Sequence, residues 1–177
     1  MPRLPARWTT TRLDARPATT ADADATFAAW TSVAACTRWL SFPTAKTVEE
    51  SRAFLETVEH AWAGAGGHLS WLLHEGEQLI GSIGADVEGP IATVGYVIAP
   101  AYWGQGYATE ALRRLCEVAL AEPTIYRVEA TCDVENTASA RVMEKAQMQR
   151  EGRLRRHTIF PNVAAGPRDV WLYARVV

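Results

Sequence analysis

The sequence predicts an α/β (α+β) fold, in which a mixed, mostly antiparallel central sheet of about seven strands is flanked by about four helices. Three apolar runs between residues 69 and 99 are separated only by the turns Glu75-Gly76 and Glu88-Gly89-Pro90, which is typical of an antiparallel meander. The third run is followed by a helical pattern and then by another strand pattern. That order favours a parallel pair joined by a right-handed crossover.

Size and composition fit an ordinary globular protein. The chain has 177 residues, of which 48% are hydrophobic and 21% charged, so we expect one domain over residues 1–177 with a substantial core. Residues 1–11 are expected to form a loose N-terminal arm. The net charge of −2 gives no case for nucleic-acid or membrane partners. No run approaches the roughly 18 apolar residues of a membrane span, and no signal-peptide core is seen, so we expect a cytoplasmic protein.

Cysteine and histidine positions predict no metal site. Cys36, Cys116 and Cys132 are odd in number and far apart, which favours buried free thiols. The histidines, at positions 60, 68, 74 and 157, form no pattern with metal-ligand spacing.

The first half of the chain reads as a short strand followed by two helices. The strand covers 12–16 and is ended by Pro17, and a helix capped by Thr19 or Thr20 follows to about Ala35. The T-x-x-E box at 47–50 opens a second helix, which glycines 64, 66 and 67 end. The side chains at helical spacing on its expected core face are Phe54, Leu55, Val58 and Trp62.

The second half contains the remaining strands and two more helices. Strands are expected at 69–74, 78–87, 91–99, 125–132, near 147–155 and at 170–176. Helices are expected from about residue 107 to Pro123 and over 136–146, and Glu110 and Arg114 should pair at i,i+4 on the solvated side of the first.

The stretch Ala101–Leu112, AYWGQGYATEAL, predicts an anion site. Two glycines lie between a strand and a helix start, where unpaired backbone N–H groups and the helix dipole attract a phosphate. A dinucleotide site is disfavoured, because Thr109 stands at the third glycine of G-x-G-x-x-G and the lysine of a P-loop is missing.

This stretch resembles the acyl-CoA signature of the GCN5-related N-acetyltransferases (GNAT), in the branch of the RimJ/RimL ribosomal-protein acetyltransferases. Two further stretches resemble the same branch: T-x-R-L-x-x-R-P at 10–17 and DVENTASARVMEKAQM at 133–148. In the last, Gln147 departs from the usual glycine, which implies a strained or differently shaped helix end. The resemblance covers residues 10–176 and implies a cofactor cleft between the two central parallel strands. Residues of the first stretch that match are Tyr102, Trp103, Gly104, Gly106, Tyr107, Ala108, Thr109, Glu110 and Ala111.

The resemblance implies acetyl-CoA as cosubstrate, with its pyrophosphate on the backbone N–H groups of Gln105 to Thr109. Asn136 is an ideal helix N-cap, and in the family it also bonds the pantetheine arm. The basic run from Arg150 to His157 is expected to be a solvated face, rather than a site for an acidic acceptor or the CoA 3′-phosphate. The expected cofactor-binding residues are Val97, Ile98, Trp103, Gly104, Gln105, Gly106, Tyr107, Ala108, Thr109, Asn136 and Ser139.

The resemblance also implies catalytic roles. Ser139 is the candidate proton donor to the leaving thiolate, because Met143 stands where many relatives carry a tyrosine. The backbone N–H of Val97, or of Ile98 beside it, should meet the oxyanion. The general base stays unassigned, because Thr93 replaces the glutamate of many relatives. The loop around Trp39, Leu40, Phe42 and Pro43 either walls the acceptor pocket or covers the core. The carboxylates that remain as alternatives for the general base are Asp86, Glu88, Glu129 and Asp133.

The function expected from these features is direct transfer of the acetyl group of acetyl-CoA to a primary amine. The amine is a protein N-terminus or a small molecule, and the enzyme is a monomer or a homodimer. The alternative is a catalytically silent acyl-CoA-binding module, suggested by Thr93 and Met143. A nucleotide binder is supported by the glycine turn alone.

Overall fold

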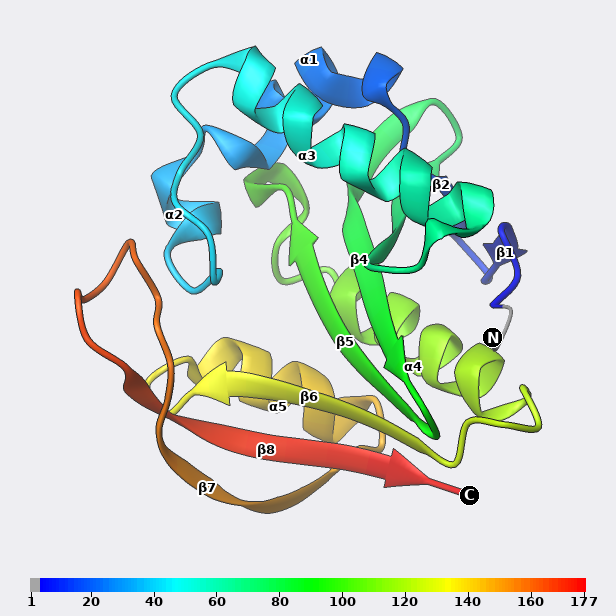
Figure 1. The fold of residues 1–177 in the computed structure, drawn as a ribbon, viewed down its shortest axis with the longest axis vertical. Coiled ribbons are helices and arrows are strands. Elements are labelled where there is room, and N and C mark those ends of the chain that lie inside the picture. The colour runs from blue at the N-terminus through cyan, green and yellow to red at the C-terminus, as the bar shows by residue number, and fades with distance from the viewer. Residues whose placement is uncertain (1–3) are drawn as a thin grey trace.

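One eight-stranded sheet runs through the computed structural model, which describes residues 4–177 (Figure 1). The strand order is β1-β2-β3-β4-β5-β6-β8-β7, and every neighbouring pair is antiparallel except β5 and β6, which are parallel. The predicted fold class is confirmed, with one strand more than expected. The strands are β1 (Trp8–Thr9), β2 (Asp14–Pro17), β3 (Leu69–Glu75), β4 (Gln78–Glu88), β5 (Ile91–Ile98), β6 (Arg127–Asp133), β7 (Gln149–Thr158) and β8 (Arg168–Val176).

The central meander of β3, β4 and β5 is buried on both faces. Trp71 and Leu73 pack into one hydrophobic cluster, whereas Leu72 between them packs into a second. Alternate side chains of a strand point to opposite faces of the sheet, so the two clusters are its two sides. This explains why the sequence of these strands is nearly continuously apolar instead of alternating.

Helices cover both faces. In Figure 1, α3 (Val48–His60) crosses in front of the sheet, together with α1 (Ala23–Thr26) and α2 (Ala34–Thr37) at the same end of the molecule. Behind the sheet lie α4 (Tyr107–Leu120) and α5 (Thr137–Lys145). Within residues 4–177, none of the helices combines the length and the apolar character that crossing a membrane requires. Shorter helical segments are η1 (Thr20–Asp22), η2 (Phe27–Thr31), η3 (Ala61–Ala65) and η4 (Pro100–Tyr102).

The helix expected from Thr19 or Thr20 to Ala35 is not continuous. The segments η1, α1 and η2 follow one another, Val33 then takes an extended conformation, and α2 begins at Ala34. At this break the carbonyl of Phe27 accepts both the hydroxyl of Ser32, at 2.7 Å, and its backbone N–H, at 3.3 Å, so the side chain competes for a backbone acceptor. Helical periodicity in the sequence does not register such local competition.

The expectation of a loose arm is wrong for residues 4–11, and residues 1–3 lie outside the described part of the chain. Leu4 and Trp8 are each only 5% exposed, and β1 pairs with β2. The Trp8 ring lies 6.2 Å from that of Trp71. Burial of these two large apolar side chains anchors the arm to the sheet edge.

Phe54 also departs from expectation, because it is 42% exposed. Its ring stacks on that of Phe42, with the centroids 6.2 Å apart, instead of entering the core. Leu55 and Val58 on the same helix are buried as expected.

Candidate functional site

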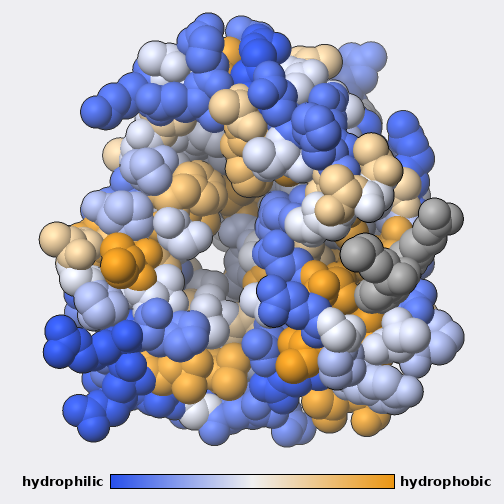
Figure 2. Space-filling model, in the orientation of Figure 1, coloured by the Kyte–Doolittle hydropathy of each residue, from blue (hydrophilic) through white to orange (hydrophobic). Residues whose placement is uncertain are grey.

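A cleft opens where the two parallel strands separate. β5 pairs with β6 only from Ile91 to Thr93, opposite Arg127 to Glu129. Beyond that point, 94–98 and 130–132 line opposite sides of a cavity of about 1420 Å³. Figure 2 shows the molecule hollowed at its centre in this region. Strands that separate leave backbone N–H and C=O groups without sheet partners, so the cleft is a place for an extended ligand.

The glycine turn forms the start of α4 at this cleft. Gly104 and Gly106 have φ angles of 76° and 85°, in the left-handed region that favours glycine. Gly106 is the N-cap residue, and no side chain caps the helix, so its first N–H groups remain available. Because the helix dipole adds positive charge there, the turn can bind a phosphate.

The predicted residues of this turn divide into two groups. Trp103, Gly104, Gly106, Ala108 and Thr109 line the cavity. Gln105 does not line it, and its side-chain amide donates to the carbonyl of Ala101 at 3.0 Å. Tyr107 does not line it either, and its hydroxyl donates to Glu75 at 2.6 Å. Both side chains therefore stabilise the turn from the side that faces away from the cavity.

The backbone of β5 corrects one expectation. The N–H of Ala99 donates to the carbonyl of Ile80 on β4. The pairing of β4 with β5 continues from there without a register shift, with Ser82 opposite Val97. Successive residues of a strand direct their polar groups to opposite sides. The backbone N–H and C=O of Val97 therefore point toward β4, and this N–H is not free for an oxyanion, although Val97 lines the cavity. The N–H of Ile98 faces the cleft, where the carbonyl of Ile98 accepts a bond from Trp103 Nε1 at 2.6 Å.

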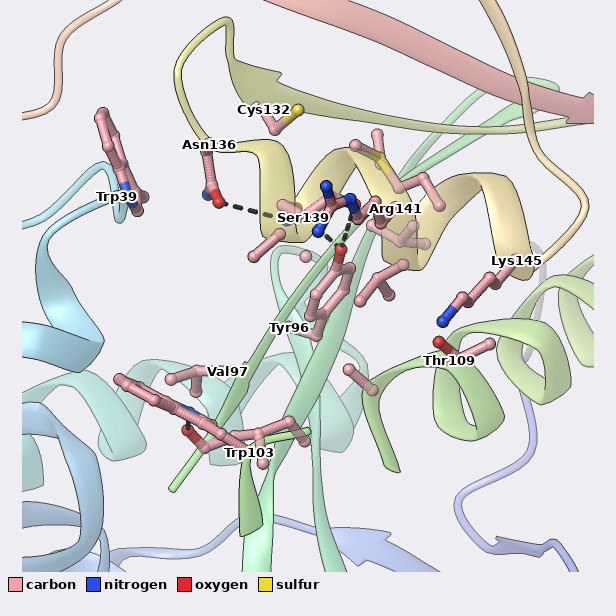
Figure 3. A pocket seen from close by; sticks show the side chains of 18 of the residues that line it. Trp39, Tyr96, Val97, Trp103, Thr109, Cys132, Asn136, Ser139, Arg141 and Lys145 are labelled. Carbon is pink, nitrogen blue, oxygen red and sulfur yellow. Dashed lines mark hydrogen bonds between the residues drawn. The ribbon is translucent and has the colours of Figure 1, made fainter. Parts of the chain in front are cut away.

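Ser139 lies at the middle of the cavity, in contact with Tyr96 (Figure 3). The Ser139 Oγ and Tyr96 Oη atoms are 2.7 Å apart, and the phenol also donates to the Ser139 carbonyl at 3.2 Å. Burial raises the pKa of Tyr96 well above its usual value, so the phenol stays protonated. Asn136 caps α5 as expected, with its Oδ1 accepting from the Ser139 N–H at 3.1 Å. Met143, 0% exposed, belongs to the core.

Sequence reasoning missed Tyr96. The residue lies inside an apolar strand, where a tyrosine is usually a core side chain. Its polar end becomes significant only because β5 and β6 separate and α5 places Ser139 opposite the hydroxyl.

The far end of the cavity is formed by the loop after α2 and the β7–β8 connection. Trp39, Leu40 and Phe160 line this end, and the Trp39 and Phe160 rings meet edge to face at 6.2 Å. The Arg38 guanidinium lies 4.9 Å from the centre of the Trp39 ring. Figure 3 shows Trp39 on one side of the Tyr96–Ser139 pair and Thr109 on the other, so the cavity has two distinct ends.

None of the four carboxylates considered as a base lines the cavity. Asp86 pairs with His68 at 2.9 Å, and Glu129 pairs with Arg127 at 2.7 Å. Asp133 is 0% exposed and bonded to Arg168. Burial raises the pKa of Asp133, but the hydrogen bonds from Arg168 and the Glu135 N–H outweigh it, and the pKa is lowered. These carboxylates are held by structural partners, and Glu88 lies at the end of β4.

Carboxylates that do line the cavity come from α4. They are Glu110 and Glu117, both on the side of the glycine turn. The expected pair of Glu110 with Arg114 does not form: Glu110 is bonded by Thr10 and Arg12, and Arg114 pairs with Glu117 at 3.3 Å.

Among residues 4–177, no group of three or more His, Cys, Asp or Glu side chains is placed to hold a metal ion. The basic side chains of the run 150–157 are exposed and lie outside the cavity lining.

Comparison with known proteins places this site in a family. Residues 12–149 match the acetyltransferase (GNAT) domain family. The chain is 28% identical to N-acetyltransferase p20 of Bacillus licheniformis, a protein described as uncharacterized, over 82% of this chain and 84% of that protein.

Solved structures share the fold. A GNAT-family acetyltransferase from Bacillus anthracis superposes with a TM-score of 0.83 at 26% identity, over 96% of this chain and 98% of that one. RimL, a ribosomal L7/L12 alpha-N-protein acetyltransferase in complex with coenzyme A, gives a TM-score of 0.83 at 21% identity, over 98% and 97% of the two chains. At that identity the likeness is one of fold.

The residues present fit acetyl-CoA, because a cavity of about 1420 Å³ meets an uncapped helix start at the glycine turn. Acetyl-CoA supplies the activated acetyl group. The comparisons give no support to a silent module. From the family match, the fold and the cleft together, the chain belongs to the GNAT family and is an acetyl-CoA-dependent N-acetyltransferase.

Proposed function

We propose that this enzyme acetylates α-amino groups, such as a peptide or protein N-terminus, by direct transfer from acetyl-CoA. The observation that carries the proposal is the absence of a built-in base. Among the described residues that line the cavity there is no histidine, and the carboxylates stand on α4 at the glycine-turn end. An amine acceptor must therefore reach the site with little help in losing its proton.

The acid strength of the amine then decides between acceptors. An α-amino group has a pKa of about 8, so about a quarter of it is neutral at pH 7.5, whereas a lysine amine with a pKa of about 10.4 is neutral in about one molecule per thousand. The neutral lysine amine is the stronger nucleophile and recovers part of this difference. A preference of at least about tenfold for the α-amino group is the expected net effect.

The cofactor is placed by the glycine turn and α5. In this proposal the diphosphate rests on the N–H groups from Gly106 to Thr109, and the free Nδ2 of Asn136 bonds the pantetheine arm. The acetyl oxygen faces the N–H of Ile98, the group on β5 that points into the cleft. An N–H in this position stabilises the charge that develops during transfer.

Ser139 and Tyr96 serve the leaving thiolate. The Ser139 hydroxyl donates its proton to the thiolate as the C–S bond breaks and takes a proton from the Tyr96 phenol, 2.7 Å away. The proton that the amine loses as the amide forms returns to the phenol, so that the net transfer is from the amine to the CoA sulfur. The raised pKa of Tyr96 suits a donor and excludes a role as base at neutral pH.

The end of the cavity at Trp39 accepts the amine. The rings of Trp39 and Phe160 provide apolar walls for the first side chain of a peptide. Arg38 adds a positive charge, and no carboxylate of the cavity lining stands at this end to hold a second ammonium group. Polyamines should accordingly be poor acceptors.

Two matched peptides test the proposal. One has a free N-terminus and no lysine, and the other has the same sequence with an acetylated N-terminus and one lysine. CoA release is measured from pH 6.5 to 9. The proposal expects at least tenfold higher kcat/KM for the free N-terminus at pH 7.5, with a rise that follows ionisation of that amine. Equal or better use of the lysine peptide would overturn it, and binding of acetyl-CoA without turnover of any amine would revive the silent module.

A further inference from the structure

The motif at residues 10–17 has a role that its strand does not explain. Thr10 and Arg12 precede β2, yet their side chains reach across to Glu110 in the first turn of α4. The Thr10 hydroxyl and the Arg12 backbone N–H both donate to Glu110 Oε1, the latter at 3.1 Å. Arg12 Nε and Nη2 lie 2.7 and 2.6 Å from Oε2. Two stretches far apart in sequence are thus joined through one carboxylate.

The same arginine also holds the glycine turn. Arg12 Nη1 donates to the carbonyl of Gln105 at 3.2 Å, and its guanidinium lies 4.1 Å from the centre of the Tyr107 ring. In a planar trans peptide the C=O and the following N–H point in opposite directions. A Gln105 carbonyl directed at Arg12 therefore directs the Gly106 N–H away from Arg12. Gly104 and Gly106 line the cavity and Gln105 does not, which agrees with this orientation.

Charge gives the contact a second effect. Glu110 lines the cavity close to the helix start, where an unpaired carboxylate would repel a diphosphate. Arg12 neutralises it at short range. Burial raises the pKa of Glu110, but the hydrogen bonds from Thr10 and Arg12 outweigh this and lower it, so the pair stays ionised at neutral pH.

We infer that Arg12 is a positioning residue for the diphosphate of acetyl-CoA: it orients the Gly106 peptide toward the cleft and cancels the charge of Glu110. This inference rests on the proposed placement of the cofactor on the glycine turn. It assigns a purpose to the T-x-R part of the N-terminal motif and to the glutamate of the turn together.

The test compares acetyl-CoA with S-acetylpantetheine, a donor that lacks the diphosphate and the nucleotide. For Arg12→Gln, loss of the charge-assisted contacts should raise the Kd for acetyl-CoA at least about tenfold. The kcat/KM with S-acetylpantetheine should stay within about twofold of the wild-type value. Arg12→Lys keeps the charge but cannot bond Glu110 and the Gln105 carbonyl together, so its Kd should be intermediate. Adding Glu110→Gln to Arg12→Gln should recover part of the affinity.

Arg16→Gln is the matched control. Arg16 lies on β2 and makes a comparable ion pair with Asp22 at 2.6 Å, but its hydrogen bonds go to Pro17 and Asp22 and do not reach the glycine turn. This variant should lose stability without changing the Kd for acetyl-CoA. Equal losses with both donors in Arg12→Gln and Arg12→Lys, or no loss with either, would overturn the positioning role. Failure of the wild-type enzyme to distinguish the two donors would instead overturn the cofactor placement itself.

Discussion

Asn162 ties together the two loops that form the acceptor end of the cavity, and its removal is the most informative perturbation of that end. Its Nδ2 donates to the carbonyls of Thr37 and Phe42 at 2.8 and 2.9 Å. Its Oδ1 accepts from the N–H and the hydroxyl of Thr44 at 3.0 and 3.2 Å. One half-buried amide on the β7–β8 connection thereby holds the loop that carries Trp39.

The magnitude follows from these four bonds. Each contributes about 0.5–1.5 kcal/mol net, and water replaces part of it because the loops are half-exposed, so Asn162→Ala should cost about 2 kcal/mol. For a chain of this size that lowers Tm by roughly 4–8 °C. Because the loop that Asn162 holds carries Trp39 at the proposed acceptor end, its loosening should raise the acceptor KM by up to about 30-fold, the equivalent of 2 kcal/mol.

The assay is a pair of measurements on the same variant. Acceptor KM is obtained by CoA release, and the Kd for acetyl-CoA is obtained by calorimetry and should stay within twofold, because the glycine turn is held by other contacts. Asn162→Asp keeps the oxygen that Thr44 uses, but sets a negative charge against two carbonyl oxygens. Its acceptor KM should be at least as high as that of the alanine variant. A lowered Tm with an unchanged acceptor KM would refute the assignment of this end to the amine.

Three further outcomes are expected. Ser139→Ala should lower kcat about 10- to 100-fold with little change in the Kd for acetyl-CoA. Adding Tyr96→Phe should cost less than the separate effects combined, because the two hydroxyls act as one unit, and single-turnover kinetics on the double-mutant cycle measure this. Gln147 has a φ of 67°, so Gln147→Gly should gain about 1 kcal/mol and raise Tm by roughly 2–4 °C, whereas Gln147→Ala should gain nothing in calorimetry. Burial raises the pKa of the Cys116 and Cys132 thiols to about 11, so at pH 8 they are far less ionised than an exposed thiol. Labelling with a disulfide reagent should therefore be slow in the folded protein and accelerate as the pH approaches 11.

Local patterns in the sequence determined the parts of this protein that depend on neighbours along the chain. The meander from Leu69 to Ile98, the turn at Gly104 and Gly106 and the cap at Asn136 are each built within about ten to thirty residues, and each could be predicted. Turn glycines and cap side chains act on backbone groups a few positions away, so their effect is visible in the sequence. Gln147 takes the left-handed conformation that a glycine usually adopts there, and the N–H of Met148 bonds the carbonyl of Met143, so its departure from glycine strains the helix end without changing its shape.

The tertiary structure decided everything that depends on strands parting or on segments meeting. No pattern in residues 91–98 indicates that β5 leaves β6 after Thr93, yet this separation makes the cavity and leaves the N–H of Ile98, which points away from β4, without a strand partner. Tyr96 gains a partner only when α5 folds over β5, and Arg12 meets Glu110 across 98 positions of sequence. Such contacts are selected by the packing of the whole chain, because the free energy that places them comes from burial elsewhere in the core.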